Sequence, residues 1–324
     1  MISFRTSLAV TSLVCAATVA SAQVVGVATN PQGSLYYSVG AAVAGVLQQK
    51  AGMTARVQPS SGSSAYAPLV SRGQIEFGLL NALDVVNAYK GVDNFKDRAN
   101  PDLRLVAVMF ALPIGIAVPN DSPAKLIRDL KGLRMPSQFT AQSTIVSVQN
   151  AVLATGGLSI ADMRQFPVPE YVKGMQALGE GKVDAALFCF ACGTAQEVNA
   201  QLASRGGLRF LSLTDTPEAV AAMRKVFSSA YLKVFQPAPA YAGIIGPTRV
   251  MVYSAFLASS TKTSDEVVYK ATKAIYQNKE ALAAASAALK SFEPGLMAEA
   301  SAVPYHPGAE KFYREAKEWP PKQR

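Results

Sequence analysis

The sequence of 324 residues is poor in the side chains that most often carry chemistry, with one histidine and three cysteines. Cys15 falls in an N-terminal segment that we expect to be removed, which leaves Cys189, Cys192 and His306. Two cysteines and one distant histidine are too few for a convincing metal site. A lone histidine cannot complete a catalytic triad, and the sequence has no G-x-S-x-G nucleophile motif. We therefore expect no catalytic residue, metal or cofactor.

Charged residues are also scarce, at 16%, whereas hydrophobic residues make up 50% of the chain. This balance favours a well-buried globular core and argues against disorder. The formal net charge is +9, but the basic residues are scattered, and no compact basic run carries interleaved aromatics. A nucleic-acid partner is therefore not expected. The scattered charge is explained by solvated helix faces or by a mild field that favours anionic small ligands.

Long apolar runs are missing beyond the N-terminal segment. The longest, Leu105–Val118, is interrupted by Pro113 and Gly115 and is too short to span a bilayer. We interpret it as two consecutive core strands, Leu103–Phe110 and Gly115–Val118.

The N-terminal segment Met1–Ala22 has the organisation of a signal peptide. Arg5 precedes an apolar run, Leu8–Ala20, which ends in an A-x-A cleavage site. We expect cleavage before Gln23 and export to the periplasm as a soluble protein. A lipoprotein signal and an uncleaved anchor are the alternatives.

Strand and helix signals alternate through the mature chain. Apolar residues at helical spacing predict a helix over Tyr37–Lys50, between strands at Val24–Ala28 and Thr54–Gln58. The βαβαβα pattern of residues 24–91 predicts an open, mostly parallel sheet covered by helices on both sides. A second alternating block follows, and the chain is expected to return to the first near Tyr241–Gly246. The remainder is predicted to be helical, at Arg249–Ala258, Ser264–Asn278, Lys279–Phe292 and Ala309–Trp319.

This organisation predicts an α/β protein with two lobes and a ligand cleft between them. We assign residues 23–118 plus 244–324 to lobe 1 and residues 119–243 to lobe 2. Open α/β sheets bind ligands beyond the carboxyl ends of their strands, where helix N-termini present backbone N–H groups. The loops at such positions are residues 30–37, 59–64, 81–84, 137–144 and 188–194.

Candidate ligand-binding residues are the polar, aromatic and glycine positions of these loops. Their hydroxyl and amide groups can donate and accept hydrogen bonds, and tyrosine adds an apolar ring. Asp84 is interpreted as a first-turn helix charge and His306 as a structural residue. The candidates are Ser34, Tyr36, Tyr37, Ser61, Ser63, Asn81, Gln138, Gln142, Ser143, Thr144, Phe190 and Gly193.

The Cys189-x-x-Cys192 pair leaves alternatives open. A redox dithiol requires a strand followed by Cys-x-x-Cys at the start of a helix. Val183–Phe190 resembles such a strand and Thr194–Leu202 such a helix, but Gly193 intervenes. A local disulfide or two buried thiols are therefore preferred to thiol catalysis.

Several short motifs occur in order along the mature chain: Gly33–Gly40, Ser61–Ser64, Leu69–Gly78, Gly181–Ala185, and Tyr305–Ala309 with Tyr313 and Glu315. In that order they resemble the G-T-Y-Y-x-x-G, G-G-S, L-x-x-G-x-x-D-x-G, G-K-x-D-A and H-P-G-A…Y-x-E segments of TAXI-type solute-binding proteins. These proteins are the extracytoplasmic receptors of tripartite ATP-independent periplasmic (TRAP) transporters.

The resemblance implies a type II periplasmic-binding-protein fold whose lobes close on a small organic acid or amino acid. It further implies delivery of this ligand to TRAP permease subunits, with no hydrolysis by this chain. One departure concerns Ser137–Ile145, where the family carries a Gly-rich G-x-G-T-R loop and this sequence keeps only Thr144. Without the arginine, bidentate capture of a carboxylate is less assured, so a neutral, hydroxylated or aromatic ligand gains weight.

Two other functions remain open on the sequence. A type II binding protein of an ATP-driven (ABC) importer, or of a sensor, would have the same fold and residues. An enzyme on this fold would need a cluster of titratable groups in the cleft, and the candidate loops contain almost none.

Overall fold

The computed structural model describes residues 24–322, so the expected signal peptide lies outside the described residues. Its strands are β1 (Val24–Thr29), β2 (Thr54–Pro59), β3 (Phe77–Asn81), β4 (Leu103–Pro119), β5 (Arg134–Gln138), β6 (Arg164–Val168), β7 (Ala186–Phe188), β8 (Leu208–Phe210), β9 (Tyr231–Phe235) and β10 (Thr248–Ser260). Its helices are α1 (Leu35–Lys50), α2 (Ser63–Ser71), α3 (Ala82–Lys90), α4 (Thr144–Ala154), α5 (Tyr171–Gly179), α6 (Gly193–Gln201), α7 (Pro217–Val226), α8 (Asp265–Gln277), α9 (Lys279–Ala285) and α10 (Pro307–Glu315).

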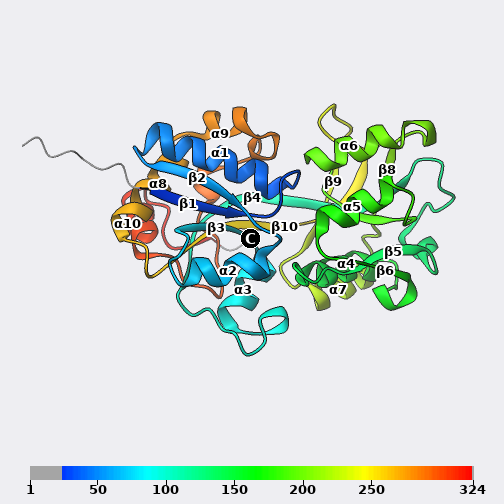
Figure 1. Ribbon diagram of the computed structural model, residues 1–324, viewed down its shortest axis with the longest axis horizontal. Coiled ribbons are helices and arrows are strands. Elements are labelled where there is room, and N and C mark those ends of the chain that lie inside the picture. Colours follow the sequence, from blue (N-terminus) through cyan, green and yellow to red (C-terminus); the bar gives the residue numbers. More distant parts are fainter. Residues whose placement is uncertain (1–23, 323–324) are drawn as a thin grey trace, which may run out of the picture.

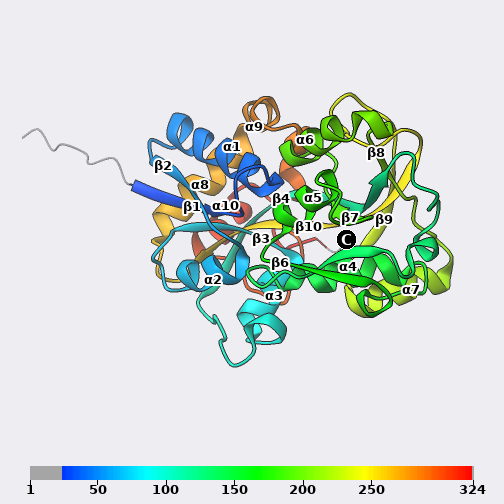
Figure 2. The same cartoon turned by 45° about the vertical axis from the view of Figure 1, so that its right-hand side comes forward.

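Two α/β lobes lie side by side, and the long strands β4 and β10 run from one to the other (Figure 1, Figure 2). In the first lobe, α1 and α9 lie on one side of the sheet and α2 and α3 on the other. In the second lobe, α5 and α6 lie opposite α4 and α7. The predicted fold class is confirmed.

The sheet of the first lobe has the order β2-β1-β3-β10-β4. Strands β2, β1 and β3 are parallel, as the βαβαβα pattern predicts, whereas β10 runs antiparallel to both of its neighbours, β3 and β4. The sheet is therefore mixed rather than mostly parallel. The far end of β4 pairs with β7 and β8 of the second lobe, where β5 and β6 form a separate parallel pair.

The prediction of two strands within residues 103–118 was wrong, because β4 continues through Pro113. Pro113 pairs with Val252 of β10, and β7 begins to pair with β4 only at Gly115. A proline is tolerated in a strand where its missing N–H faces no partner. At Pro113 only one edge of β4 is paired along the named strands, so the strand continues.

The predicted helix at Arg249–Ala258 was also wrong, because these residues belong to β10. Nearly all of β10 is buried, so its apolar residues form a continuous run without alternation. Such a run cannot be distinguished from a buried helix by periodicity alone. The chain returns to the first lobe just after the expected Tyr241–Gly246, through β10, which begins at Thr248 and pairs with β3. Strand β9, which was not predicted, pairs with the start of β10.

Other helix predictions were largely confirmed. The helix predicted over Tyr37–Lys50 is α1, which begins two residues earlier, at Leu35. Helix α8 matches the predicted Ser264–Asn278 within one residue at each end. The segment between β4 and β5 contains only a short 3-10 helix, Ile127–Leu130. Helices α9 and α10 are shorter than predicted.

Cys189 and Cys192 form a disulfide in the loop between β7 and α6. This outcome matches the local disulfide that the spacing allows and leaves no free thiol in the described residues. Within residues 24–322, no helix combines the length and the apolar character needed to cross a bilayer.

His306 has the structural role expected of it. Its ring is buried, Nε2 lies 3.0 Å from the carbonyl oxygen of Ser260 and 3.1 Å from that of Thr263, and Nδ1 accepts the backbone N–H of Gly308 at the start of α10. The ring is therefore neutral with its proton on Nε2, and burial lowers the pKa of His306 below its ordinary value.

His306 is expected to make the fold sensitive to mild acid. A lowered histidine pKa in the folded state means that this contribution to stability is present above the ordinary value near 6.5 and is lost as the pH falls below it. His306→Gln should lower the free energy of unfolding at neutral pH by about 1–3 kcal/mol, because buried backbone groups lose their partners. It should also flatten the fall of Tm over this pH window. An unchanged pH profile in the variant would contradict this assignment.

Candidate functional site

A cavity lies where the two lobes meet over the connecting strands. The first lobe contributes Asn30, Ser34, Leu35, Tyr36, Ser63, Asn81 and Asp84. The second lobe contributes Gln142, Ile145, Tyr171 and Cys189, and the connecting strands contribute Leu112, Ile114 and Tyr253. The cavity encloses about 30 Å³, room for about two water molecules. A larger occupant requires the lobes or the lining side chains to move apart.

Several helices begin at the cavity. Ser34 caps α1, and its side chain accepts the backbone N–H of Tyr37 at 3.1 Å. Asn81 caps α3, and its Oδ1 accepts the N–H of Asp84 at 2.7 Å. Tyr171 lies at the start of α5 in the second lobe. These starts place helix N-termini of both lobes around the cavity. At the start of α5 the first N–H groups are already satisfied, because Tyr171 donates to Gln142 and the next two residues donate to the Glu170 carboxylate.

Asp84 carries the formal charge of the cavity. Its side chain is buried, with 3% of the residue exposed. Asn81 Nδ2 donates to Asp84 Oδ2 at 2.6 Å, and the Thr144 hydroxyl donates to Oδ1 from the second lobe. Burial raises the pKa of Asp84, while the hydrogen bonds from Thr144, Ser63, Asn94 and Asn81 oppose that rise.

Three tyrosines line the same cavity as Asp84. Tyr36, Tyr171 and Tyr253 are all buried, and burial raises the pKa of each hydroxyl. The hydroxyls of Tyr36 and Tyr171 make no hydrogen bond among the described residues, although the Cys189 backbone N–H lies near Tyr171. In contrast, the hydroxyl of Tyr66, behind the cavity, donates to the carbonyl oxygen of Leu79. A buried hydroxyl without a partner is costly, so Tyr36 is a polar group available to an occupant of the cavity.

Direct contacts hold the lobes together at the rim. The Asp84–Thr144 hydrogen bond is one of them. A second joins the Thr194 N–H and hydroxyl of α6 to the carbonyl oxygen of Gly33, at 3.3 and 3.2 Å. A third is the packing of Gly62, at the start of α2, against Ala141, so close that an added Cβ would overlap the Ala141 carbonyl oxygen.

The structure brings only part of the predicted set together. Ser34, Tyr36, Ser63, Asn81 and Gln142 line the cavity, and Thr144 reaches it through Asp84. The other candidates lie outside the lining: Tyr37, Ser61, Gln138, Ser143, Phe190 and Gly193.

These outlying residues have identifiable positions. Ser61 and Gln138 are exposed, and Gln138 adopts a positive φ of 66° in the turn that ends β5. Phe190 points into an aromatic cluster with Phe210, Phe235 and Tyr241 and lines a different cavity. For all of them, ligand contact stays a prediction.

Sequence reasoning missed the residues that give the cavity its charge and rings. Asp84 is a first-turn residue, as expected, but it also lines the cavity. Tyr171 follows β6 at the start of α5, so the strand-end rule that selected the other loops could have found it. Tyr253 gave no usable signal, because its segment resembled a helix.

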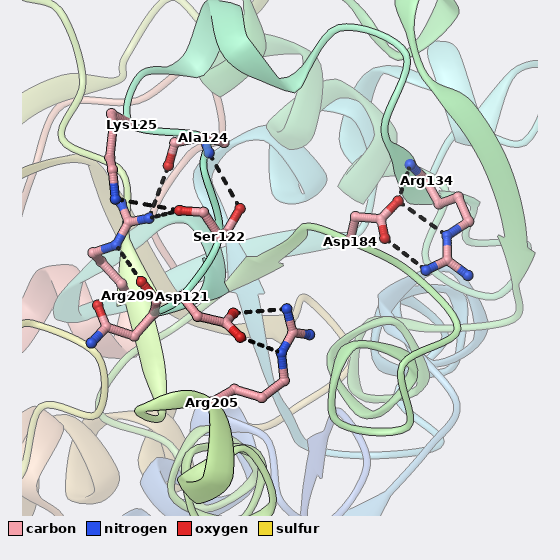
Figure 3. A network of polar contacts seen from close by, with 9 residues as sticks. Asp121, Ser122, Ala124, Lys125, Arg134, Asp184, Arg205 and Arg209 are labelled. Carbon is pink, nitrogen blue, oxygen red and sulfur yellow. Dashed lines mark hydrogen bonds and ion pairs between the residues drawn. The ribbon is translucent and has the colours of Figure 1, made fainter.

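Three arginines of the second lobe bind acceptors within that lobe (Figure 3). Arg134 Nη2 lies 2.6 Å from Asp184 Oδ1, and Arg205 Nη2 lies 2.7 Å from Asp121 Oδ1. Arg209 Nη2 donates to two backbone carbonyls of the loop after β4, each at 2.9 Å. Among the described residues, no lysine, arginine or histidine lines the cavity. Nor do three or more His, Cys, Asp or Glu residues gather there into a group that could hold a metal.

Two solved structures share this fold over most of their length. One is described as a periplasmic transporter, with 14% identity, coverage of 93% of this chain and 94% of the other, and a TM-score of 0.58. The other is a binding protein component of an ABC phosphonate transporter from Pseudomonas aeruginosa, with 11% identity, coverage of 83% and 80%, and a TM-score of 0.54. At these identities the similarity shows the two-lobed fold of periplasmic binding proteins.

The sequence also matches a family directly. Residues 27–316, nearly all of the described chain, match the NMT1-like family. The match includes both lobes, the two connecting strands and every residue that lines the cavity. The chain therefore belongs to the NMT1-like family.

Proposed function

We propose that this protein is a periplasmic solute-binding protein that captures a small solute between its lobes for delivery to a membrane transporter. The observation that carries the proposal is the cavity itself, because both lobes and both connecting strands contribute buried polar groups to it. Concave sites with a few placed polar groups, located between lobes, are the usual form of small-molecule sites. The family match and the fold support this function.

Capture follows from the geometry of the rim. When the lobes separate, the contacts of Asp84 with Thr144, and of Gly33 with Thr194, are broken and the cavity opens to solvent. A solute that contacts both lobes stabilises the closed form by its differential affinity for the two forms. The Tyr36 hydroxyl and the helix N-termini supply donors that a solute can use. Binding needs no catalytic group.

Two kinds of transporter compete as the partner. The phosphonate-binding neighbour is a component of an ABC transporter, which favours an ATP-driven importer. The ordered motifs from Gly33–Gly40 to Glu315 favour a TRAP permease instead. We propose the ABC importer as the first candidate and the TRAP permease as the second. Co-purification of the protein with permease subunits encoded beside it tests this choice, because a copurifying ATP-binding subunit supports the first alone.

The first test of solute binding is thermal unfolding of protein that was stripped of bound solutes by unfolding and refolding. The stripped protein is first mixed with a filtered low-molecular-mass cell extract, and then with panels of amino acids, organic acids, amines and polyols. A ligand that binds only the folded form raises Tm with concentration. Absence of any shift with the extract and with every panel would contradict the proposed function.

Tyr36→Phe is expected to weaken solute binding without lowering the stability of the stripped protein. Because the Tyr36 hydroxyl has no partner, its removal should leave the free energy of unfolding of the stripped protein unchanged within about 0.5 kcal/mol, or raise it. Binding should weaken by about tenfold, the effect of losing about 1.4 kcal/mol. Tyr66→Phe is the matched control, since its hydroxyl donates to the Leu79 carbonyl, and this variant should lose about 1–3 kcal/mol of stability. Normal binding by Tyr36→Phe would show that the hydroxyl does not face the solute.

A further inference from the structure

We propose that the solute carries a protonated amine and that the carboxylate of Asp84 is the counter-ion for this group. The inference rests on the proposed function and adds to it the chemical class of the solute. It also narrows the sequence-based expectation of an organic acid or amino acid toward the amine-bearing members.

The formal charge of the cavity comes from the side chain of Asp84. Within residues 24–322, Asp84 is the one lining residue with a formal charge, and no basic side chain lines the cavity. The described ion pairs include none with Asp84. The ionisable groups that face Asp84 are Tyr36, Tyr66 and Tyr253, which are neutral at physiological pH. Asp84 is hydrogen-bonded but has no opposite charge beside it among the described residues, so a cationic group of the solute would supply the missing partner.

Neutral hydrogen-bond donors from both lobes hold the Asp84 carboxyl group in place. Asn81 and Thr144 donate to different oxygens of the carboxyl group, and Ser63 and Asn94 add further hydrogen bonds. All four donors are neutral. They fix the orientation of the group from both lobes but supply no opposite charge. A carboxylate that is oriented in this way is preorganised for a cation, because little motion is needed when the cation arrives.

Tyrosine rings form much of the lining of the cavity beside Asp84. The rings of Tyr36, Tyr171 and Tyr253 come from α1, α5 and β10 and line the same cavity. The faces of tyrosine rings attract ammonium groups through the ring quadrupole, most strongly in desolvated sites. A ring set beside one carboxylate, without a basic side chain, suits an amine better than an anion.

The same features disfavour a solute that carries only acidic groups. Such a solute would place a second negative charge beside Asp84 in a desolvated site, where like charges repel strongly. Helix α1 begins at the cavity in the first lobe, where its dipole favours a carboxylate, so an amino acid remains compatible. The start of α5 is not available to such a group, because the carboxylate of Glu170 already caps it. The excluded class is therefore the acid without an amine.

The chemical class of the solute can be tested before its identity is known. The filtered low-molecular-mass extract is acidified, so that amines and amino acids are cationic, and is passed over a strong cation exchanger. We expect the fraction eluted from the resin to raise Tm of the stripped protein and the flow-through to be inactive. Stabilising activity that remains in the flow-through would overturn the inference while the proposed function stands. No activity in the unfractionated extract would overturn both.

Matched five-carbon probes and variants locate the amine. Cadaverine and δ-aminovalerate are compared with glutarate, which has the same chain length without an amine. At least one amine-bearing probe should raise Tm, and glutarate should not. A larger shift with glutarate than with either amine would overturn the inference.

Variants then assign the binding to Asp84. Asp84→Asn should weaken binding of the active fraction by at least about tenfold. Asp97→Asn is the control, because it removes an exposed carboxylate whose φ of 60° suits asparagine. Equal binding by Asp84→Asn and Asp97→Asn would overturn the role of Asp84. In the wild-type protein, affinity should fall as the pH drops through the pKa of Asp84, and this fall should be absent in Asp84→Asn.

Discussion

Gly62→Ala is expected to hold the two lobes apart and to weaken solute binding by at least about tenfold. In the closed form, an added Cβ would overlap the carbonyl oxygen of Ala141 and the Cγ of Gln142, which both belong to the second lobe. The backbone of Gly62 is extended, with φ of 167°, so alanine causes no local strain. The first lobe should therefore fold normally, and the cost should fall on closure alone.

Small-angle X-ray scattering on Gly62→Ala measures this effect directly. The variant should have a larger radius of gyration than the wild-type protein in the presence of the filtered extract, and a smaller rise of Tm. Gly45→Ala on α1 is the matched control, because a Cβ at Gly45 meets no atom within 4 Å. It should stabilise the protein by about 0.5–1 kcal/mol, the helix-propensity gain, and leave binding unchanged. Wild-type compaction and binding by Gly62→Ala would contradict closure by this contact.

Asp84→Asn is expected to raise the stability of the stripped protein even though it removes binding. Burial raises the pKa of Asp84, so ionising this group in the folded state opposes folding. Replacing a functional-site residue that opposes folding commonly raises the free energy of unfolding by about 0.5–2 kcal/mol. Each kcal/mol raises Tm by about 2–4 °C in a chain of this size. Asparagine can keep both contacts if its Oδ1 accepts from Asn81 Nδ2 and its Nδ2 donates to the Thr144 hydroxyl, which reverses the second hydrogen bond.

The pH dependence identifies the cause. A carboxyl group with a raised folded-state pKa costs nothing while it is protonated in both states. The cost appears as the pH rises above the ordinary value near 3.8 and becomes constant above the folded-state pKa. The difference in Tm between Asp84→Asn and the wild-type protein should therefore be small in acid, grow with pH and then level off. A difference that is constant across pH would show that Asp84 ionisation is not responsible.

The parallel part of the fold could be predicted from the sequence because its signals are local. Glycines such as Gly91 end the helices in left-handed conformations, and apolar positions such as Val39 and Val43 repeat at helical spacing. Of the two connecting strands, β4 was predicted as two shorter strands, whereas β10 was predicted as a helix, because burial on both faces erases the alternation that marks a strand. Pro113 misled for a different reason, because its effect depends on which strand edges are paired.

The candidate site was predicted to the extent that it depends on strand ends. Ser34, Ser63 and Asn81 lie at helix starts that follow strands or turns, and they line the cavity as that rule predicts. Tyr253 comes from the middle of β10, where a side chain reaches the cavity only because the strand passes beneath it. The charge of Asp84 carries weight only once the absence of a basic neighbour among the described lining residues is known, which is a property of the tertiary structure.

The most direct test of the central claim is the radius of gyration of the stripped protein, measured by small-angle X-ray scattering with and without the filtered low-molecular-mass extract. Capture of a solute between the lobes predicts that the extract lowers the radius of gyration and raises Tm in the same concentration range. A radius of gyration and a Tm that both stay constant as the extract is added would contradict capture of a solute by this cavity.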